Sequence, residues 1–339
     1  MLIWCLACVL VFIASYAGTS GLRRYALARQ LLDVPNARSS HSQPTPRGGG
    51  VAIVLAYLLA LAGLLVTGTL DSGWAWAMLG AGCAVAALGF LDDHGHIPAR
   101  WRLLGHFMAA GWLMSWVGGL PGLEVFGHVL NLGWVGNLLG GLYLVWMLNL
   151  YNFMDGIDGI ASAEAITTCL GGALAALIGG HTALIAPALL LAAATSGFLL
   201  WNFPPARIFM GDAGSGFLGL MLAALSIQAS QAAPELFWSW LILLGVFVVD
   251  ATYTLMRRML RGEKLYEAHR SHAYQFASRQ HGRHLPVTVV IVVINVLWLL
   301  PLSLIVAIGW LDGLTGILIA YFPLLLLAIK YNAGGREHR

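Results

Sequence analysis

Long apolar stretches separated by short polar segments cover most of the 339-residue chain. A helix of about 20 apolar residues crosses the roughly 30 Å hydrocarbon core of a bilayer. Eleven stretches are therefore predicted to span a membrane: 1–21, 49–68, 73–91, 103–120, 132–150, 159–179, 182–201, 214–232, 236–256, 287–309 and 313–330. Because no long polar segment remains, we predict an all-α integral membrane protein with one polytopic domain over residues 1–339.

The basic residues predict the orientation of these spans. All 18 Lys and Arg residues lie in alternate connecting segments, at 22–48, 92–102, 202–213, 257–286 and 330–339. Short cytoplasmic loops carry an excess of Lys and Arg. The N-terminus is therefore predicted to lie outside and the C-terminus in the cytoplasm.

Composition narrows the class further. Hydrophobic residues make up 59% of the chain and charged residues 10%, whereas soluble domains carry about 25% charged residues. The net charge of +3 is too small to indicate nucleic acid, so no nucleic-acid partner is expected. Four cysteines lie in apolar stretches, without the polar surroundings that a metal or redox site needs.

The predicted cytoplasmic segments hold acids, amides and histidines in clusters beside glycines. The main candidates are Asp92, Asp93, Asn149, Asn152, Asp155, Asp158, Asn202, Arg207, Asp212, His269, Arg270 and His272. Neighbouring carboxylates repel one another unless a cation is present, and oxygen ligands that include an amide suit Mg²⁺ or Mn²⁺. A divalent cation beside Arg and His commonly handles phosphate. The pattern predicts a metal-dependent transfer between a cytosolic nucleotide and a phosphorylated lipid.

Other interpretations apply to single residues. An Asp or Asn just past a helix end is often a cap or turn residue, although five acids in three short loops favour a site. Glu164 is typical of an acid at a helix start, and His106 of a packed helix histidine. Asp250 lies inside a predicted span and is a functional candidate, with Arg257 and Arg258 near enough in sequence to pair with it.

A transporter or channel with acidic ion sites is the alternative class. It predicts polar residues near the bilayer midplane and broken spans. The polar clusters here lie at one face of the membrane, which favours an enzyme with its site on the cytoplasmic face.

Four motifs in order resemble the polyprenyl-phosphate N-acetylhexosamine-1-phosphate transferases, integral membrane enzymes that begin bacterial cell-envelope polysaccharides. They are Pro-Thr-Pro-Arg-Gly-Gly-Gly at 44–50, Leu-Asp-Asp at 91–93, Asn-Leu-Tyr-Asn-Phe-Met-Asp-Gly-Ile-Asp-Gly at 149–159, and the Gly-Asp loop at 202–215. The resemblance implies transfer of an amino-sugar 1-phosphate from a UDP-sugar to undecaprenyl phosphate in the inner membrane, releasing UMP. A homodimer is a possible assembly.

The resemblance also implies residue roles. Asn152 and Asp212 would hold Mg²⁺ or, in its place, Mn²⁺, and Asp92 and Asp93 would lie beside the reacting phosphates. The uridine and diphosphate site would be shaped by Asp155, Asp158, Asn202 and Phe209. Contacts to phosphate or sugar would come from Arg47, Arg207, His269, Arg270 and His272.

Two departures from the family pattern bear on the substrate. The loop His269-Arg-Ser-His272 differs from the His-x-His-His cluster of many members, and no lysine follows the paired aspartates, so that Arg100 and Arg102 are the available cations. The first departure favours enzymes that begin O-antigen or capsule chains over the muramyl-pentapeptide branch, with UDP-GlcNAc, UDP-FucNAc or UDP-QuiNAc as donor. We expect direct attack by the lipid phosphate; a covalent route through Asp92 or Asp93 is the alternative.

Overall fold

The computed structural model describes residues 2–35, 43–95, 97–263 and 269–336, so parts of four predicted cytoplasmic segments lie outside the described residues. The helices are α1 (Leu2–Ala28), α2 (Val51–Val66), α3 (Ser72–Gly95), α4 (Ala99–Val117), α5 (Gly133–Met154), α6 (Ile160–Ile178), η1 (Thr182–Leu184), α7 (Ile185–Asn202), α8 (Asp212–Ala232), α9 (Pro234–Leu243), α10 (Gly245–Leu260), α11 (Ala273–His281), α12 (Leu285–Ile294), η2 (Asn295–Leu299), α13 (Leu300–Ala307) and α14 (Gly313–Lys330). Two short antiparallel pairs accompany them, β1 (Leu32–Asp33) with β2 (Thr45–Pro46) and β3 (Leu123–Val125) with β4 (His128–Leu130).

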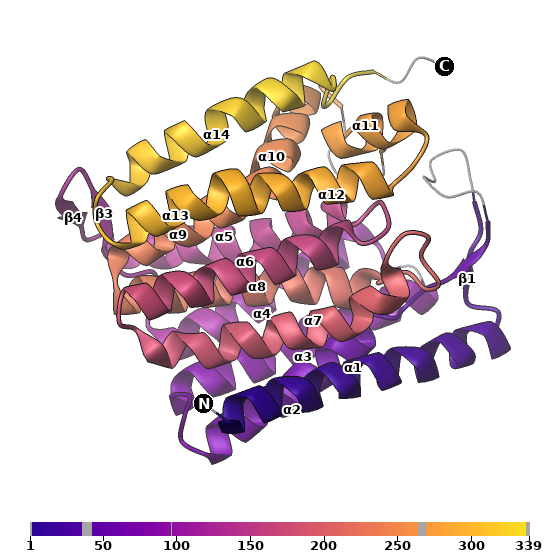
Figure 1. Ribbon diagram of the computed structural model, residues 1–339, viewed down its shortest axis with the longest axis horizontal. Coiled ribbons are helices and arrows are strands. Elements are labelled where there is room, and N and C mark those ends of the chain that lie inside the picture. Colours follow the sequence, from indigo (N-terminus) through magenta and orange to yellow (C-terminus); the bar gives the residue numbers. More distant parts are fainter. Residues whose placement is uncertain (1, 36–42, 96, 264–268, 337–339) are drawn as a thin grey trace.

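Helix α8 lies at the centre of the bundle, surrounded by the other helices (Figure 1). Every residue from Ala213 to Ser230 is buried. Its small residues let neighbouring backbones approach closely, as is common in membrane helix packing. A Cβ on Gly219 would lie 2.6 Å from the carbonyl oxygen of Met147 in α5. The start of α8 is therefore held at a set place among its neighbours.

The helices form a multi-pass membrane protein, and the predicted all-α class is confirmed. Among the described residues, seven helices are long and apolar enough to cross a membrane, and a bent pair raises the number to eight. Helix α2 has only 16 residues, and α4 and α5 are not among the seven. The count of eleven spans stays a prediction. Helix α1 begins at one end of the bundle, and α14 ends at the other (Figure 1).

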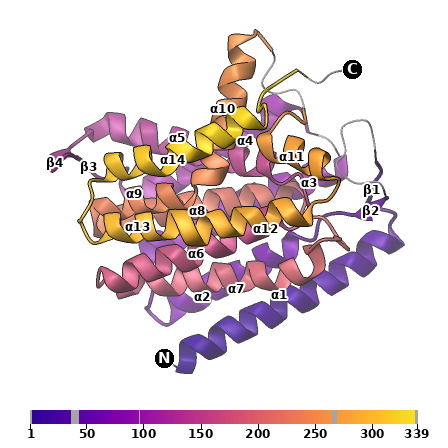
Figure 2. The same ribbon diagram turned by 45° about the horizontal axis from the view of Figure 1, so that its top comes forward.

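The predicted span over 236–256 is broken near its middle. The chain breaks at Leu244 into α9 and α10, whose axes meet at 72°. The polar side chains of Asp250, Thr254 and Arg258 are buried on α10. Polar side chains are costly in contact with lipid, so this helix needs polar protein groups beside it. Figure 2 shows the far end of α10 standing clear of the bundle.

Glu164 is not the helix-start acid expected from its position. Its side chain is fully buried, and its Oε2 accepts a hydrogen bond from Asn295 Nδ2 at 2.7 Å. Asn295 also donates to Thr167 Oγ1 at 2.8 Å and begins the π-helical segment η2. A polar contact inside the membrane thus joins α6 to the irregular turn between α12 and α13.

Candidate active site

The paired aspartates at the end of α3 have different partners. Asp92 accepts hydrogen bonds from the backbone N–H of Ile97 at 2.6 Å and from Arg102 at 2.5 Å. Asp93 accepts from the backbone N–H groups of Asp212 and Ala213 at 3.2 and 3.4 Å. Successive residues of a helix point about 100° apart, so Asp92 reaches α4 while Asp93 reaches the start of α8.

Gly211 makes the contact between Asp93 and α8 sterically feasible. Its φ is +80°, and a Cβ there would lie 2.6 Å from Asp93 Oδ2. The amino end of a helix carries partial positive charge and favours a carboxylate. The Gly211-Asp212 sequence is therefore needed both for its conformation and for the space beside Asp93.

Arg47 also contacts Asp93. Its guanidinium donates to the backbone oxygen of Asp93 at 2.6 Å and lies 3.2 Å from the carboxylate. Backbone hydrogen bonds hold this arginine in place, because Phe209 N–H donates to Pro46 at 2.8 Å and Gly49 N–H donates to Phe209 at 2.9 Å. The first predicted cytoplasmic loop and the Gly-Asp loop therefore lie side by side.

Arg102 joins two of the predicted acids. It pairs with Asp92 and lies 3.4 Å from Asp212 Oδ2. All three residues line a cavity of about 490 Å³ between α3, α4, α5 and α8. The Asp212 side chain is 34% exposed, whereas that of Asp92 is 5% exposed and that of Asp93 4%. Of these three acids, Asp212 presents the most accessible carboxylate.

Asn152 lies in the wall of the same cavity. Its Oδ1 accepts a hydrogen bond from Ser215 Oγ, one turn into α8, at 2.7 Å. Asp155 follows at the end of α5, and burial together with the charges of Asp212, Asp93 and Asp158 raises its pKa to about 7. Mutual repulsion of this kind is what a bound cation would relieve.

The donor atoms fit a magnesium ion that keeps part of its water shell. Among the described residues, no three His, Cys, Asp or Glu side chains converge as a metal site. Magnesium is commonly held by only one or two carboxylates together with substrate phosphates. The accessible carboxylate of Asp212 and the amide oxygen of Asn152 match that requirement, and their role as ligands remains a proposal.

Asp158 and Asn202 bind neighbouring loops. Asp158 accepts from the backbone N–H of Ala206 at 3.0 Å and lies 3.1 Å from His284 Nδ1. Asn202 is buried, accepts from Gly159 N–H at 2.9 Å and donates to the backbone oxygen of Ile208 at 3.0 Å. These contacts tie the α5–α6 loop to the Gly-Asp loop. The predicted roles of Asp158, Asn202 and Phe209 toward uridine stay predictions.

Arg207 lies away from the carboxylates in its described contacts. It is exposed, and its guanidinium lies 5.9 Å from the centre of the Trp201 ring. Arg270 follows His269, and its backbone oxygen accepts from Arg279 at 3.1 Å. Phosphate binding by either arginine stays a prediction.

The two predicted histidines stack on each other, with ring centres 4.9 Å apart. His269 also lies 6.2 Å, ring to ring, from Phe153 in the last turn of α5. Burial and the neighbouring His272 and Arg258 lower the pKa of His269 to about 3. The histidine loop therefore packs beside the end of α5, next to the predicted metal ligand Asn152.

His106 and Asn149 complete the polar wall of the cavity. The expectation for His106 was a packed helix histidine, but it lines the cavity. Its position four residues after Arg102 places both on one face of α4. This spacing of four residues is the feature of the sequence that could have placed His106 beside Arg102. A single histidine in an apolar helix does not by itself indicate a site.

Comparisons with known proteins agree with this arrangement. Residues 75–230 match the family model described as glycosyl transferase family 4. The chain is 30% identical over 260 residues to the Bacillus subtilis protein named "Probable undecaprenyl-phosphate N-acetylglucosaminyl 1-phosphate transferase", covering 75% of this chain and 71% of that one. It is 26% identical over 271 residues to the Thermotoga maritima undecaprenyl-phosphate alpha-N-acetylglucosaminyl 1-phosphate transferase, covering 80% and 81%. It is also 30% identical over 238 residues to a Streptococcus thermophilus phospho-N-acetylmuramoyl-pentapeptide-transferase, covering 66% and 68%.

The fold and the site define a multi-pass membrane protein with a carboxylate-lined cavity at one end of its helix bundle. The comparisons assign such a protein to the transferases. The chain belongs to the polyprenyl-phosphate N-acetylhexosamine-1-phosphate transferase family, as its four motifs predicted.

Proposed function

We propose that the protein transfers an N-acetylated amino-sugar 1-phosphate from a UDP-sugar to undecaprenyl phosphate and releases UMP. The cavity beside Asp212 carries this proposal. Asp92, Arg102 and Asp212 form a charged wall, and an apolar wall is formed by Val85, Leu88, Leu103 and Leu148. A cavity with both kinds of wall suits a substrate that has a phosphate head and a hydrocarbon tail.

The proposed chemistry needs no strong general base. The second pKa of a phosphate monoester lies near 6, so the lipid phosphate is mostly a dianion at pH 7. One of its oxygens attacks the β-phosphorus of the UDP-sugar. The bond from that phosphorus to the bridging oxygen breaks, and UMP leaves with the electron pair.

The charged residues would lower the repulsion between the two substrates. Mg²⁺, held by Asn152 and Asp212, would neutralise phosphate charge when bound. Arg102 and Arg47 would keep their neighbouring carboxylates oriented and add positive charge. Asp92 already accepts one short hydrogen bond on each carboxylate oxygen, and these bonds lower its nucleophilicity. This favours direct attack over the two-step route.

The donor we propose to test first is UDP-GlcNAc, because two of the relatives above carry N-acetylglucosaminyl in their names. UDP-FucNAc and UDP-QuiNAc are the next candidates. The proposed role is the first step of O-antigen or another cell-envelope polysaccharide in the bacterial inner membrane. The charge pattern supports a cytoplasmic C-terminus, and a reporter fused there that proves external would contradict this orientation.

The test uses detergent-purified protein, undecaprenyl phosphate and each UDP-amino sugar in turn. We expect UMP release and a lipid-linked sugar diphosphate with at least one donor. A transporter would give no measurable reaction in detergent, because transport needs a sealed compartment and does not cleave the UDP-sugar. Absence of product with every donor, from protein that remains folded, would refute the proposed reaction.

A second assay separates the two mechanisms. Direct attack requires both substrates, so labelled UMP should not exchange into UDP-sugar without lipid. A covalent route would form a sugar-phosphoryl enzyme and catalyse that exchange. Exchange in rigorously lipid-free enzyme would refute direct attack and make Asp92 or Asp93 the residue to trap.

A further inference from the structure

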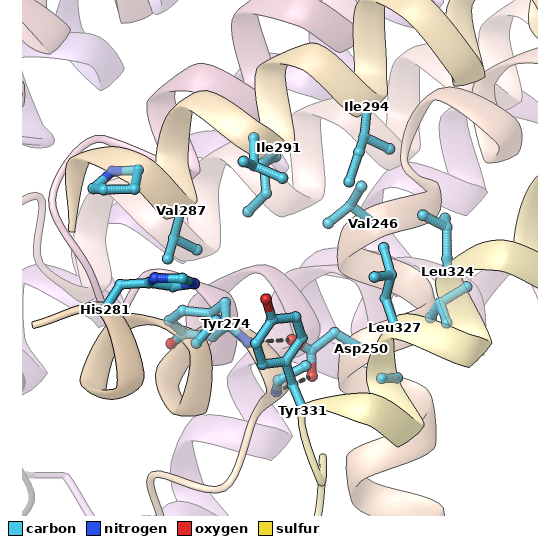
Figure 3. A pocket seen from close by; sticks show the side chains of 16 residues that line it. Val246, Asp250, Tyr274, His281, Val287, Ile291, Ile294, Leu324, Leu327 and Tyr331 are labelled. Atoms are coloured by element: carbon cyan, nitrogen blue, oxygen red, sulfur yellow. Dashed lines mark hydrogen bonds between the residues drawn. The ribbon is translucent and has the colours of Figure 1, made fainter. Parts of the chain in front are cut away.

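Asp250 joins two segments of the chain through its buried carboxylate. It lies on α10 and is 6% exposed. Its Oδ1 accepts from the backbone N–H of Ala273 at 2.9 Å, and its Oδ2 from that of Tyr274 at 3.0 Å (Figure 3). Thr254 Oγ1 donates to Oδ1 at 3.1 Å. The first two residues of α11 are thus held by a carboxylate that comes from another helix.

The same carboxylate lies beside the ring of His272. His272 Nδ1 lies 3.3 Å from Asp250 Oδ1. Carboxylate oxygens mainly accept hydrogen bonds, so this contact favours a proton on Nδ1. His272 Nε2 is buried with no hydrogen-bond partner among the described residues, which an unprotonated nitrogen tolerates better than a buried N–H donor would. Both contacts therefore favour the Nδ1–H form of this ring.

Through α11, Asp250 also reaches the loop that carries Asp155. Tyr274 donates its hydroxyl to the backbone oxygen of Phe153 at 3.0 Å. A Cβ on Gly156 would almost coincide with that hydroxyl, at 2.1 Å. The end of α5 and the α5–α6 loop therefore pack closely against the start of α11, and a displaced α11 would displace the stacked histidines and this loop together.

The surroundings explain why a polar anchor is needed at this place. On its apolar side, α11 faces a cavity of about 230 Å³ between α10, α12 and α14 (Figure 3). Its lining includes Val246, Ala277, Val287 and Leu327. A cavity removes the dispersion contacts that would otherwise fix a helix. The directional hydrogen bonds to Asp250 remain to set the position of α11.

We propose that Asp250 is a positioning residue of the candidate active site: it places His269 and His272 beside the α5–α6 loop by binding the start of α11 and the Nδ1–H of His272. The kinetic test of this inference rests on the proposed function, because it measures transfer activity. Asp250 acts through the histidine loop and does not itself meet the substrates.

The kinetic test compares Asp250→Asn with Asp312→Asn. Asp312 is a matched control at the far end of the bundle, because its carboxylate accepts from Leu314 and Thr315 at the start of α14 and from Phe126 of another segment. We expect kcat/KM to fall about tenfold or more in Asp250→Asn, since small misplacements of a site residue are costly, and Asp250→Glu to recover part of the loss. Equal kinetics for the two Asn variants at similar melting temperatures would overturn the proposal.

A double-mutant cycle with His272→Ala tests whether Asp250 acts through the histidine. If it does, the loss in the double variant is smaller than the product of the two single losses, because coupled residues are not additive. Multiplicative losses would refute the coupling.

A measurement independent of activity separates this proposal from the proposed function. In protein labelled with ¹⁵N-histidine, the signals of His272 are identified by their loss in His272→Ala. We expect the Nδ1–H form in the wild type, and we expect that form to lose its dominance in Asp250→Leu, which offers His272 no acceptor. An Nε2–H ring in the wild type, or an unchanged form in the variant, would overturn the role of Asp250 even if transfer activity is found.

Discussion

The carboxylate of Asp93 accepts a hydrogen bond from the backbone N–H of Asp212, with 3.2 Å between Asp93 Oδ1 and the nitrogen. The residue beside the proposed metal is therefore held at the start of α8 by one of the paired aspartates. Asp92 lines the cavity, and Asp93 is not among its lining residues. The two adjacent acids differ in position: one holds a helix end and the other faces the space for substrates.

Gly211→Ala should disturb this relationship. A side chain at its positive φ costs about 1–3 kcal/mol, and the new Cβ would displace the Asp93 carboxylate. We expect a loss of about tenfold or more in transfer rate, measured as UMP release. Gly141→Ala is the control, because a Cβ there meets nothing within 4 Å. Equal rates for the two variants would contradict the proposed importance of the Asp93 contact.

Asp212→Ala should leave a folded protein with activity reduced by at least about a hundredfold, because the proposed Mg²⁺ would lose its most accessible carboxylate. EDTA should abolish wild-type activity, and Mg²⁺ or Mn²⁺ should restore it. Asp71→Ala is the comparison, since the Asp71 carboxylate accepts hydrogen bonds only from Gly73 and Trp74 in its described contacts. Near-normal turnover in Asp212→Ala would exclude that residue from the site.

Asp155 should make the stability of the metal-free protein depend on pH. Its pKa is about 7 in the fold, above the value of about 3.9 in an unfolded chain. The stabilisation from proton binding is therefore complete below about pH 4 and is lost as pH rises through 7.

In EDTA, Asp155→Asn should accordingly melt a few degrees above the wild type at pH 8, while the two should differ less at pH 5. Added Mg²⁺ should narrow the difference at pH 8 by stabilising the wild type. Scanning fluorimetry of the detergent-solubilised proteins measures this. A difference that does not change with pH would show that the charge of Asp155 is not the cause.

Glu164→Leu should destabilise the bundle more than Glu164→Gln. Leucine leaves the buried Asn295 amide without its carboxylate acceptor, at a cost of about 1–3 kcal/mol, whereas glutamine keeps an oxygen that can accept. The free energy of unfolding in mixed micelles distinguishes the variants. Equal destabilisation would mean that the hydrogen bond at 2.7 Å does not hold α6 to η2.

The motifs predicted which residues belong to the site better than they predicted where each side chain lies. Asp92, Asn152 and Asp212 line one cavity, as expected for residues that act together. Arg207 carries the same charge as Arg47, but it lies over Trp201 while Arg47 lies at Asp93. A motif records residue types in order, and it does not record which neighbour each side chain meets.

The sequence by itself determined the membrane-embedded helical class, the one-sided distribution of charge and the family. These properties follow from the length of apolar stretches, the positions of charges and short strings of residues, all of which are local. The tertiary structure alone decided the break at Leu244, the division of labour between Asp92 and Asp93, and the partners of Asp250. Each of these depends on contacts between distant residues; Asp93 and Asp212, for example, are 119 positions apart. Such contacts form only when the packing of several helices brings the two segments together. A buried carboxylate is costly without hydrogen-bond donors, and which donors lie near it depends on that packing.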